Sequence, residues 1–180
     1  MSTRAATFGN SGRRARRAKR VPFVAVVGAG GAIDEETAKL ATRVGELIAE
    51  RGCILFTGGR GGVMKAASRG ARRAGGRVVG ILPGADAAEA NQYVEIAIAT
   101  GLGEARNAVI ATAADAMIAV GGEFGTLSEI AFALKLGKRV VVLASAWRNV
   151  PGTVRARDAA HAVAMALAGA AKARPRRRGR

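Results

Sequence analysis

The sequence predicts an α/β protein with a doubly wound, mostly parallel, Rossmann-like sheet of about six or seven strands and helices on both faces. From Phe23 onward, short runs rich in Val, Ile and Leu alternate with longer segments of helical periodicity. The runs are apolar throughout, as expected for parallel strands covered on both faces. Glycine clusters at 28–31, 58–62 and 121–125 follow three of the runs. Right-handed crossovers then give the doubly wound arrangement.

Six strands and five helices are predicted individually. The strands are expected at 23–27, 53–56, 77–82, 94–99, 115–120 and 139–144. The helices are expected at 34–51, 63–74, 103–113, 124–136 and 158–170. Residues 85–92 are predicted to form a polar loop.

The first helix shows its start and stop signals most clearly. Asp34 can cap its first turn, and Glu35 and Glu36 interact favourably with its positive end. Gly52 ends it. Its apolar stripe consists of Leu40, Val44, Leu47 and Ile48.

The composition of the 180-residue chain fits one globular domain. Hydrophobic residues make up 49% and aromatic residues 4%, which suits an α/β core. The single cysteine, Cys53, has no second cysteine to pair with, so a disulfide framework is excluded. No apolar run approaches the ~20 residues that cross a bilayer. We therefore expect a cytoplasmic protein that does not insert into membranes.

The formal net charge of +16 lies mainly at the two ends of the chain. Residues 1–22 hold seven basic and no acidic side chains, and residues 172–180 hold six more basic ones, which leaves 16 basic and 13 acidic groups between them. We expect a basic disordered tail over 1–21, a Rossmann-like nucleotide-binding domain over 22–171, and a second basic disordered tail over 172–180.

The basic tails have more than one interpretation. They can attach the protein to nucleic acid or another anionic surface, with binding that depends steeply on salt. They can also be solubilising ends, and the first can result from a misassigned start codon. The first tail is, in addition, rich in Arg and poor in acids, like a transit peptide. The sequence leaves these alternatives open.

The glycine clusters fall where ligands bind in a doubly wound sheet, beyond the carboxyl ends of the strands. A dinucleotide cofactor is not expected, because Ile33 stands where its third glycine would be. The second predicted strand also ends without the acidic residue that would bind the ribose. The 58–62 cluster lacks the Gly-Lys-Ser/Thr of a Walker A loop. Three glycine turns at one edge favour a ligand that approaches the backbone closely.

Basic residues near these turns are candidates for binding an anion. Arg60 and Lys65 flank the second cluster, beside the start of a helix. Arg106, followed by Asn107, lies near the start of the helix after the fourth strand, where it can clamp a phosphate through two hydrogen bonds. Each of these side chains can instead be a solvated surface charge.

The stretch VGGEFGTLSEI at 120–130 has two explanations. Thr126 and Glu129 have the spacing of a capping box, in which each side chain accepts a hydrogen bond from the other residue's backbone N–H. Alternatively, Glu129 turns into the cleft as a general acid or a hydrogen-bond acceptor. Capping does not account for the surrounding glycines, Gly121, Gly122 and Gly125, whereas a ligand lying on the backbone does.

No metal site or covalently bound cofactor is expected. His161, the one histidine, lies among alanines on the last predicted helix without a second ligand nearby. There is no signature for binding pyridoxal phosphate (PLP), and the glycine turns do not fit NAD.

Four motifs together resemble the SLOG superfamily. They are Gly-Gly-Arg-Gly-Gly-Val-Met (58–64), Gly-Ile-Leu-Pro-Gly (80–84), Gly-Leu-Gly-Glu-Ala-Arg-Asn (101–107) and Val-Gly-Gly-Glu-Phe-Gly-Thr-Leu-Ser-Glu (120–129). This superfamily includes molybdenum-cofactor carrier proteins and the LONELY GUY-type phosphoribohydrolases, long mislabelled lysine decarboxylases. The resemblance covers about residues 22–146 and implies a homodimer or homotetramer that binds a small phosphorylated heterocycle.

The glycine turns and the resemblance together define a candidate ligand site. Its residues are Gly28, Gly30, Gly58, Gly59, Arg60, Gly61, Gly62, Arg106, Asn107, Gly121, Gly122, Gly125, Thr126 and Glu129. The hydrolase branch implies catalytic roles for Arg106 and Glu129, in cleavage of the N-glycosidic bond of a nucleoside 5′-monophosphate.

Two departures from the hydrolase pattern decide between the branches. Val120 stands in place of the hydrolase proline, and the segment 104–107 lacks the Met, His and Lys of that branch. We therefore expect a binding protein similar to molybdenum-cofactor carriers, with that cofactor or a nucleotide as its ligand. A phosphoribohydrolase and a nucleic-acid-binding protein that uses the basic tails are the alternatives.

Overall fold

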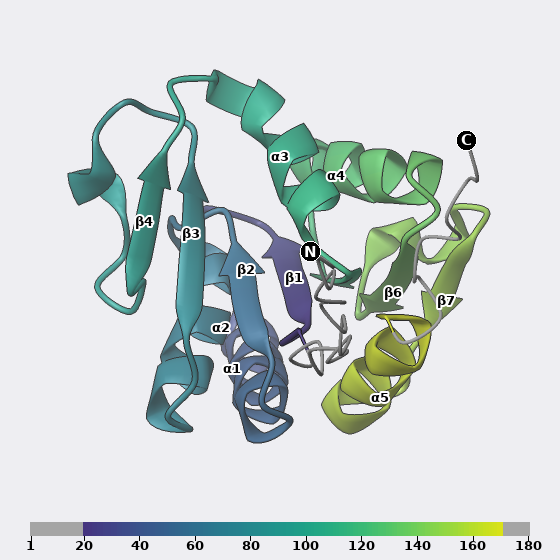
Figure 1. Cartoon of the computed structure of the whole chain (residues 1–180). Helices are drawn as coiled ribbons and strands as arrows, with labels where there is room; N and C mark the ends of the chain where they lie inside the picture. The colour runs from purple at the N-terminus through teal and green to yellow at the C-terminus, as the bar shows by residue number, and fades with distance from the viewer. Residues whose placement is uncertain (1–19, 171–180) are drawn as a thin grey trace, which may run out of the picture.

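The computed structural model describes residues 20–170 of the chain, which form seven strands and five α-helices (Figure 1). The strands are β1 (Phe23–Gly28), β2 (Ile54–Thr57), β3 (Val78–Leu82), β4 (Ile96–Ala99), β5 (Ala116–Val120), β6 (Arg139–Leu143) and β7 (Thr153–Arg155). The helices are α1 (Glu35–Glu50), α2 (Gly62–Arg73), α3 (Arg106–Ala113), α4 (Phe124–Lys135) and α5 (Ala159–Ala170). Short 3₁₀ helices are η1 (Ala87–Glu89), η2 (Gly103–Ala105) and η3 (Ala146–Asn149).

The strands form a single parallel sheet in the order β4-β3-β2-β1-β5-β6-β7, which confirms the predicted fold class. β1 lies at the centre, and the chain builds outward from it in two opposite directions (Figure 1). Gly28 pairs with Val120, so β1 and β5 end at the same level. The strand order reverses between these two strands, and ligands bind at such a reversal in doubly wound sheets.

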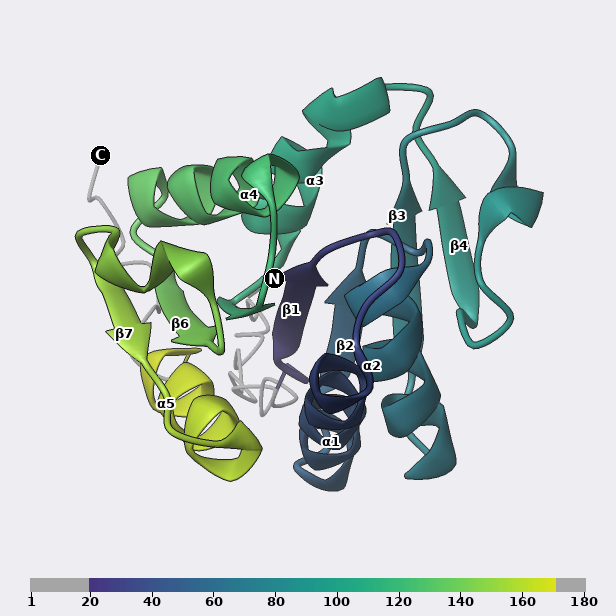
Figure 2. The ribbon, with the colours of Figure 1, turned by 180° about the vertical axis from the view of Figure 1, so that it is seen from behind.

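Helices cover both faces of the sheet and enclose two cores. α1, α2 and α5 pack on one face, and α3 and α4 on the other (Figures 1 and 2). Along β1, Val24 and Val26 belong to the first core, and Ala25 and Val27 to the second. Both sets are fully buried, which explains why the strand is apolar at successive positions.

Two glycines let α1 and α2 approach until their backbones touch. A Cβ on Gly45 would overlap the carbonyl oxygen of Ala67, and a Cβ on Gly70 would overlap that of Thr42. The two helices lie side by side over β1 and β2 (Figure 2). Their close packing therefore depends on the absence of a side chain at both positions.

The structure differs from the predicted elements in three places. β7 was not predicted, because a strand of three residues gives little periodic signal. The helix expected over 103–113 is divided into η2 and α3. β4 begins only at Ile96, because the N–H of Val94 closes a turn onto the carbonyl of Asn91 (3.0 Å).

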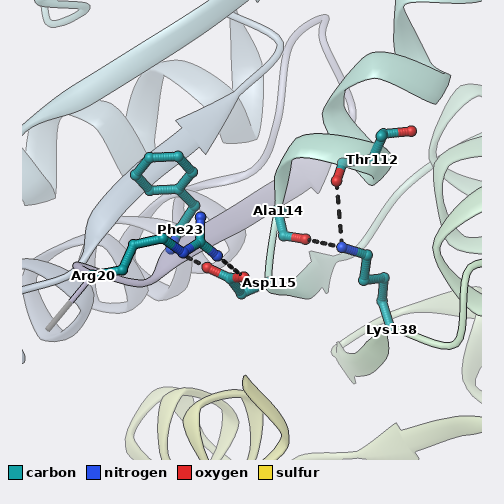
Figure 3. A network of polar contacts seen from close by, with 6 residues as sticks. All are labelled: Arg20, Phe23, Thr112, Ala114, Asp115 and Lys138. Carbon is teal, nitrogen blue, oxygen red and sulfur yellow. Dashed lines mark hydrogen bonds and ion pairs between the residues drawn. The ribbon is translucent and has the colours of Figure 1, made fainter. Parts of the chain in front are cut away.

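A polar network joins several segments at the amino-terminal edge of the sheet (Figure 3). The carboxylate of Asp115 accepts hydrogen bonds from the backbone N–H of Phe23 (2.8 Å) and from the Arg20 guanidinium. The Lys138 ammonium donates to the carbonyl of Ala114 (2.7 Å). These contacts tie the starts of β1 and β5 to the turn before β6, opposite the glycine turns.

The expected tails lie outside the described residues, apart from short pieces at the boundaries, so the division into tails and domain stays a prediction. Within residues 20–170, no helix is both long enough and apolar enough to cross a membrane.

Candidate functional site

The turns after β1 and β2 pack tightly against each other at the carboxyl edge of the sheet. The N–H of Val63 donates to the carbonyl of Ala29 (3.0 Å). Side chains at Gly61 or Gly62 would collide with backbone atoms of the first turn. A Cβ on Gly28 would collide with the side chain of Val63 (2.7 Å). These three glycines therefore have a packing reason of their own, beside any contact with a ligand.

Arg106, the first residue of α3, lies against the backbone of the second turn. A Cβ on Gly58 would overlap Nη1 of its guanidinium, so glycine is required there for Arg106 to take its place. Arg106 is only 6% exposed, and its Nε and Nη1 are enclosed without a hydrogen-bond partner. Burial lowers its pKa, and the charges of Glu129 and Glu104 act in the opposite direction. A buried cation without a partner is costly, and an oxyanion would compensate it.

Asn107 joins the start of α3 to the start of α4. Its Nδ2 donates to the hydroxyl of Ser128 (2.9 Å), which in turn donates to the carbonyl of Gly125 (2.7 Å). The side chain is 3% exposed, and its Oδ1 is enclosed without a partner. Since Nδ2 is engaged, Oδ1 is the group that remains to accept a hydrogen bond.

The capping box, one of the two explanations given for Thr126 and Glu129, is wrong. α4 begins at Phe124, with Glu123 at its N-cap and no side-chain cap. Gly121 and Gly122 take the left-handed φ values of +59° and +110° in the turn before the helix, which begins at residue 124, as the predicted range 124–136 has it. Thr126 and Glu129 therefore lie within the helix, and both are buried.

Glu129 lies in the same buried group as Arg106. Burial raises the pKa of its carboxyl from 4.5 to about 8; the positive charge of Arg106 works against this rise, and Glu104 adds to it. Among the described residues, no ion pair within 4.0 Å joins Glu129 to Arg106. At neutral pH the carboxyl is mostly protonated, so it can both donate and accept a hydrogen bond.

The second turn is held by residues that the sequence did not single out. The amide of Asn91 donates to the carbonyls of Gly59 (3.1 Å) and Arg60 (2.9 Å), and Thr57 accepts from the N–H of Gly59 (2.9 Å). Gly59 has a left-handed φ of +75° and packs against Leu82. Asn91 lies outside the sequence motifs, and Ser128 lies within one but was not singled out, because the roles of both depend on contacts between distant segments.

The remaining candidates from the sequence lie at the surface of the protein. Arg60 is exposed, and its charge is close enough to lower the pKa of Arg106. Gly30 is exposed, and a Cβ there would meet the end of Met64 (3.2 Å). Gly125 is also exposed, with open space where a side chain would be. The structure thus brings the β2 turn, the start of α3 and the start of α4 together around Arg106.

Within the described range, no group of three or more His, Cys, Asp or Glu side chains is placed to hold a metal ion. His161 lies on α5, on the other face of the sheet from α3 and α4. Burial raises the pKa of the Cys53 thiol, which disfavours the reactive thiolate.

A parallel sheet with a central reversal, and glycine turns around a buried arginine at its carboxyl edge, define a Rossmann-like ligand-binding protein. The chain belongs to the SLOG cluster4 family, whose family model matches residues 21–170.

Individual relatives are consistent with this membership. An uncharacterised protein from Archaeoglobus fulgidus is 54% identical over 120 residues, which cover 67% of this chain and 78% of the relative. The structure of a molybdenum cofactor binding protein from Rippkaea orientalis aligns with a TM-score of 0.78 at 37% identity, covering 83% of this chain and 97% of that one. The molybdenum cofactor carrier protein of Chlamydomonas reinhardtii aligns with a TM-score of 0.76 at 37% identity, covering 84% and 99%.

Proposed function

We propose that the protein binds a phosphorylated heterocycle of the pterin or nucleotide type, with the molybdenum cofactor as the first candidate. The observation that carries this proposal is Arg106, a buried cation with two enclosed nitrogens that have no partner. Its position against Gly58, at the edge where ligands of such sheets bind, supports an anionic ligand. The similarity to two proteins that bind or carry the molybdenum cofactor supports the choice of that ligand.

The neighbouring groups suit the other parts of such a ligand. The first turn of α4 has no side-chain cap, so its backbone N–H groups are available to a phosphate, together with Arg106. Oδ1 of Asn107 can accept a hydrogen bond from a ring N–H or a sugar hydroxyl. A protonated Glu129 can donate to a ring oxygen or nitrogen and accept from an adjacent N–H.

Mass spectrometry of small molecules released from the purified protein tests the proposal. We expect a phosphorylated pterin or nucleotide in wild type and its loss in Arg106→Ala, because removal of the cation leaves the phosphate without its main partner. Arg73→Ala is the matched control, since Arg73 is an exposed arginine at the end of α2. Equal ligand content in Arg106→Ala and wild type would contradict the assignment.

A phosphoribohydrolase is the second candidate, and Glu129 is the observation that favours it. A carboxyl with a pKa of about 8 is protonated at neutral pH and can serve as a general acid toward a departing base. We expect such activity, if present, to release ribose 5-phosphate from AMP and to be lost in Glu129→Gln. Ribose 5-phosphate formed by wild type but not by this variant would establish the hydrolase in place of the carrier.

We also propose that the protein forms a homodimer or homotetramer through α3 and α4. Of the eight large exposed apolar side chains among the described residues, four lie on these adjacent helices or at the C-cap of α4: Val109, Phe124, Phe132 and Leu136. Phe124 is 80% exposed, and its ring lies at a tilt to that of Trp147, with 5.7 Å between the ring centroids. A group of exposed apolar side chains on neighbouring helices is typical of an interface.

A further inference from the structure

A second cavity of about 280 Å³ lies on the α1–α2 side of the glycine turns. It is bounded by the turn after β1, by α2, and by the segment that precedes β4. Met64 lies against both glycine turns, with its Sδ beside Gly58 and its Cε beside Gly30. The cavity shares Gly62 with the candidate ligand site, but none of Arg106, Asn107 and Glu129 lines it.

Two basic side chains of α2 line this cavity. Lys65 and Arg69 are four residues apart, so they lie on the same side of the helix. α2 contains no acidic residue, and neither side chain has a carboxylate within 4.0 Å in the described part of the chain. The positive charge here is therefore not neutralised by the protein's own side chains.

The guanidinium of Arg69 is held in place before any ligand arrives. Its Nη2 donates to the hydroxyl of Thr42 on α1 (3.0 Å), and its Nε is enclosed without a partner. Thr42 itself is fixed, because its hydroxyl donates to the carbonyl of Ala38 (2.7 Å). An arginine fixed in this way loses little conformational entropy when it binds an anion.

The rest of the cavity wall is largely apolar. Ile33, Ala38 and Ala66 contribute aliphatic groups, and Tyr93 contributes an aromatic ring. Apolar walls with a few convergent polar groups are typical of sites for small organic ligands. The combination suits a molecule with an anionic end and a flat apolar part.

We propose that this cavity is a second binding site, for a phosphate carried on a planar ring, with Lys65 and Arg69 at the phosphate and Tyr93 against the ring. The site does not use Arg106, Asn107 or Glu129, so it is independent of the function proposed above. A nucleoside monophosphate has the required chemistry, because it joins a dianion to an aromatic base.

The experiment uses the fact that Tyr93 is the one tyrosine of the chain. In full-length protein labelled at the ζ carbon of tyrosine, Tyr93 gives a single ring signal by NMR, and AMP serves as the probe. We expect a saturable shift of this signal in wild type and the same shift in Arg106→Ala. Adenosine and ribose 5-phosphate should each bind at least about tenfold more weakly than AMP, since each lacks one half of the recognised structure.

The double variant Lys65→Ala/Arg69→Ala should weaken AMP binding at Tyr93 at least about tenfold. Lys65→Gln, at an exposed position that leaves Arg69 and Thr42 in place, should weaken it by a smaller factor and guards against misfolding of the double variant. Arg73→Ala removes a charge from the same helix outside the cavity and should change nothing. No saturable shift, a shift unchanged in both Lys65 variants, or a shift abolished in Arg106→Ala would overturn the proposal.

Discussion

At the scale of a single residue, the burial of Glu129 makes the free energy of unfolding depend on pH. Its carboxyl has an ordinary pKa of 4.5 and a pKa of about 8 in the fold. Between these values the folded state holds a proton that the unfolded state has released. The free energy of unfolding should therefore fall as pH rises from about 4.5 to about 8, by about a few kcal/mol in total.

Glu129→Gln should remove most of this dependence, because an amide cannot ionise. Urea unfolding at pH 5, 7 and 9 measures the effect, with Glu36→Gln, an exposed carboxyl in the first turn of α1, as the control. Parallel pH profiles for wild type and Glu129→Gln would show that the buried carboxyl is not the cause.

Gly58 controls the position of Arg106, so Gly58→Ala should affect both stability and ligand binding. The new methyl group would overlap Nη1 of Arg106 and lie 2.6 Å from Sδ of Met64. We expect a loss of about 1–3 kcal/mol and a lower ligand content in the purified protein. Gly31→Ala, where a side chain meets nothing within 4 Å, should be close to neutral.

A double-mutant cycle identifies the contact responsible. In an Arg106→Ala background, Gly58→Ala should cost less than in wild type, because the overlapping guanidinium is gone. Equal costs in both backgrounds would mean that Met64, rather than Arg106, determines the need for glycine.

Individual site residues could be predicted from the sequence where a glycine cluster follows a strand, as at Gly58, or where a basic residue lies near the start of a helix, as at Arg106. Their contact could not be predicted, because it joins the turn after β2 to a helix that starts 48 residues later and depends on how α3 crosses the sheet. The capping box at Thr126 failed for a related reason. The helix begins at residue 124 as expected, so Thr126 and Glu129 lie inside it, but their spacing matches a capping box wherever the helix starts.

At the scale of elements, the contact between α1 and α2 depends on Gly45 and Gly70. Gly45→Ala should destabilise the protein by about 2 kcal/mol or more, because the methyl group would force the two backbones apart. Gly125→Ala, also at a helical position but facing open space, should be neutral or stabilising by up to about 1 kcal/mol. Thermal unfolding compares the two, and equal melting temperatures would contradict this account of the helix pair.

Most elements were predictable from the hydrophobic pattern, since the apolar run of a buried strand and the apolar face of a helix are each visible within a few residues. Asp34 caps α1 as predicted, accepting a hydrogen bond from the N–H of Thr37 (2.7 Å). The packing of α1 on α2 was not predicted. Glycine in a helix interior has no local advantage, and the reason for Gly45 lies on another helix.

At the scale of the whole molecule, the exposed apolar groups on α3 and α4 predict self-association. Phe132 and Leu136 are 40% and 48% exposed and lie one turn apart along α4 and its C-cap. Phe132→Glu should shift the protein from dimer or tetramer to monomer in light scattering, because a charge would be buried in the interface. Arg73→Glu on α2, a charge change away from these helices, is the control. An unchanged mass for Phe132→Glu would exclude this interface.

The network around Asp115 also marks the edge of the sheet that lies opposite the glycine turns. Arg20 contacts Asp115 at the amino-terminal edge of the sheet (Figure 3), and the turns that surround Arg106 follow the carboxyl ends of the strands, at the opposite edge. The strongly basic segment that precedes Arg20 therefore joins the domain at the pole farthest from the ligand turns. A tether attached close to that junction would leave the turns around Arg106, the proposed ligand site, on the side of the domain that faces away from the attachment.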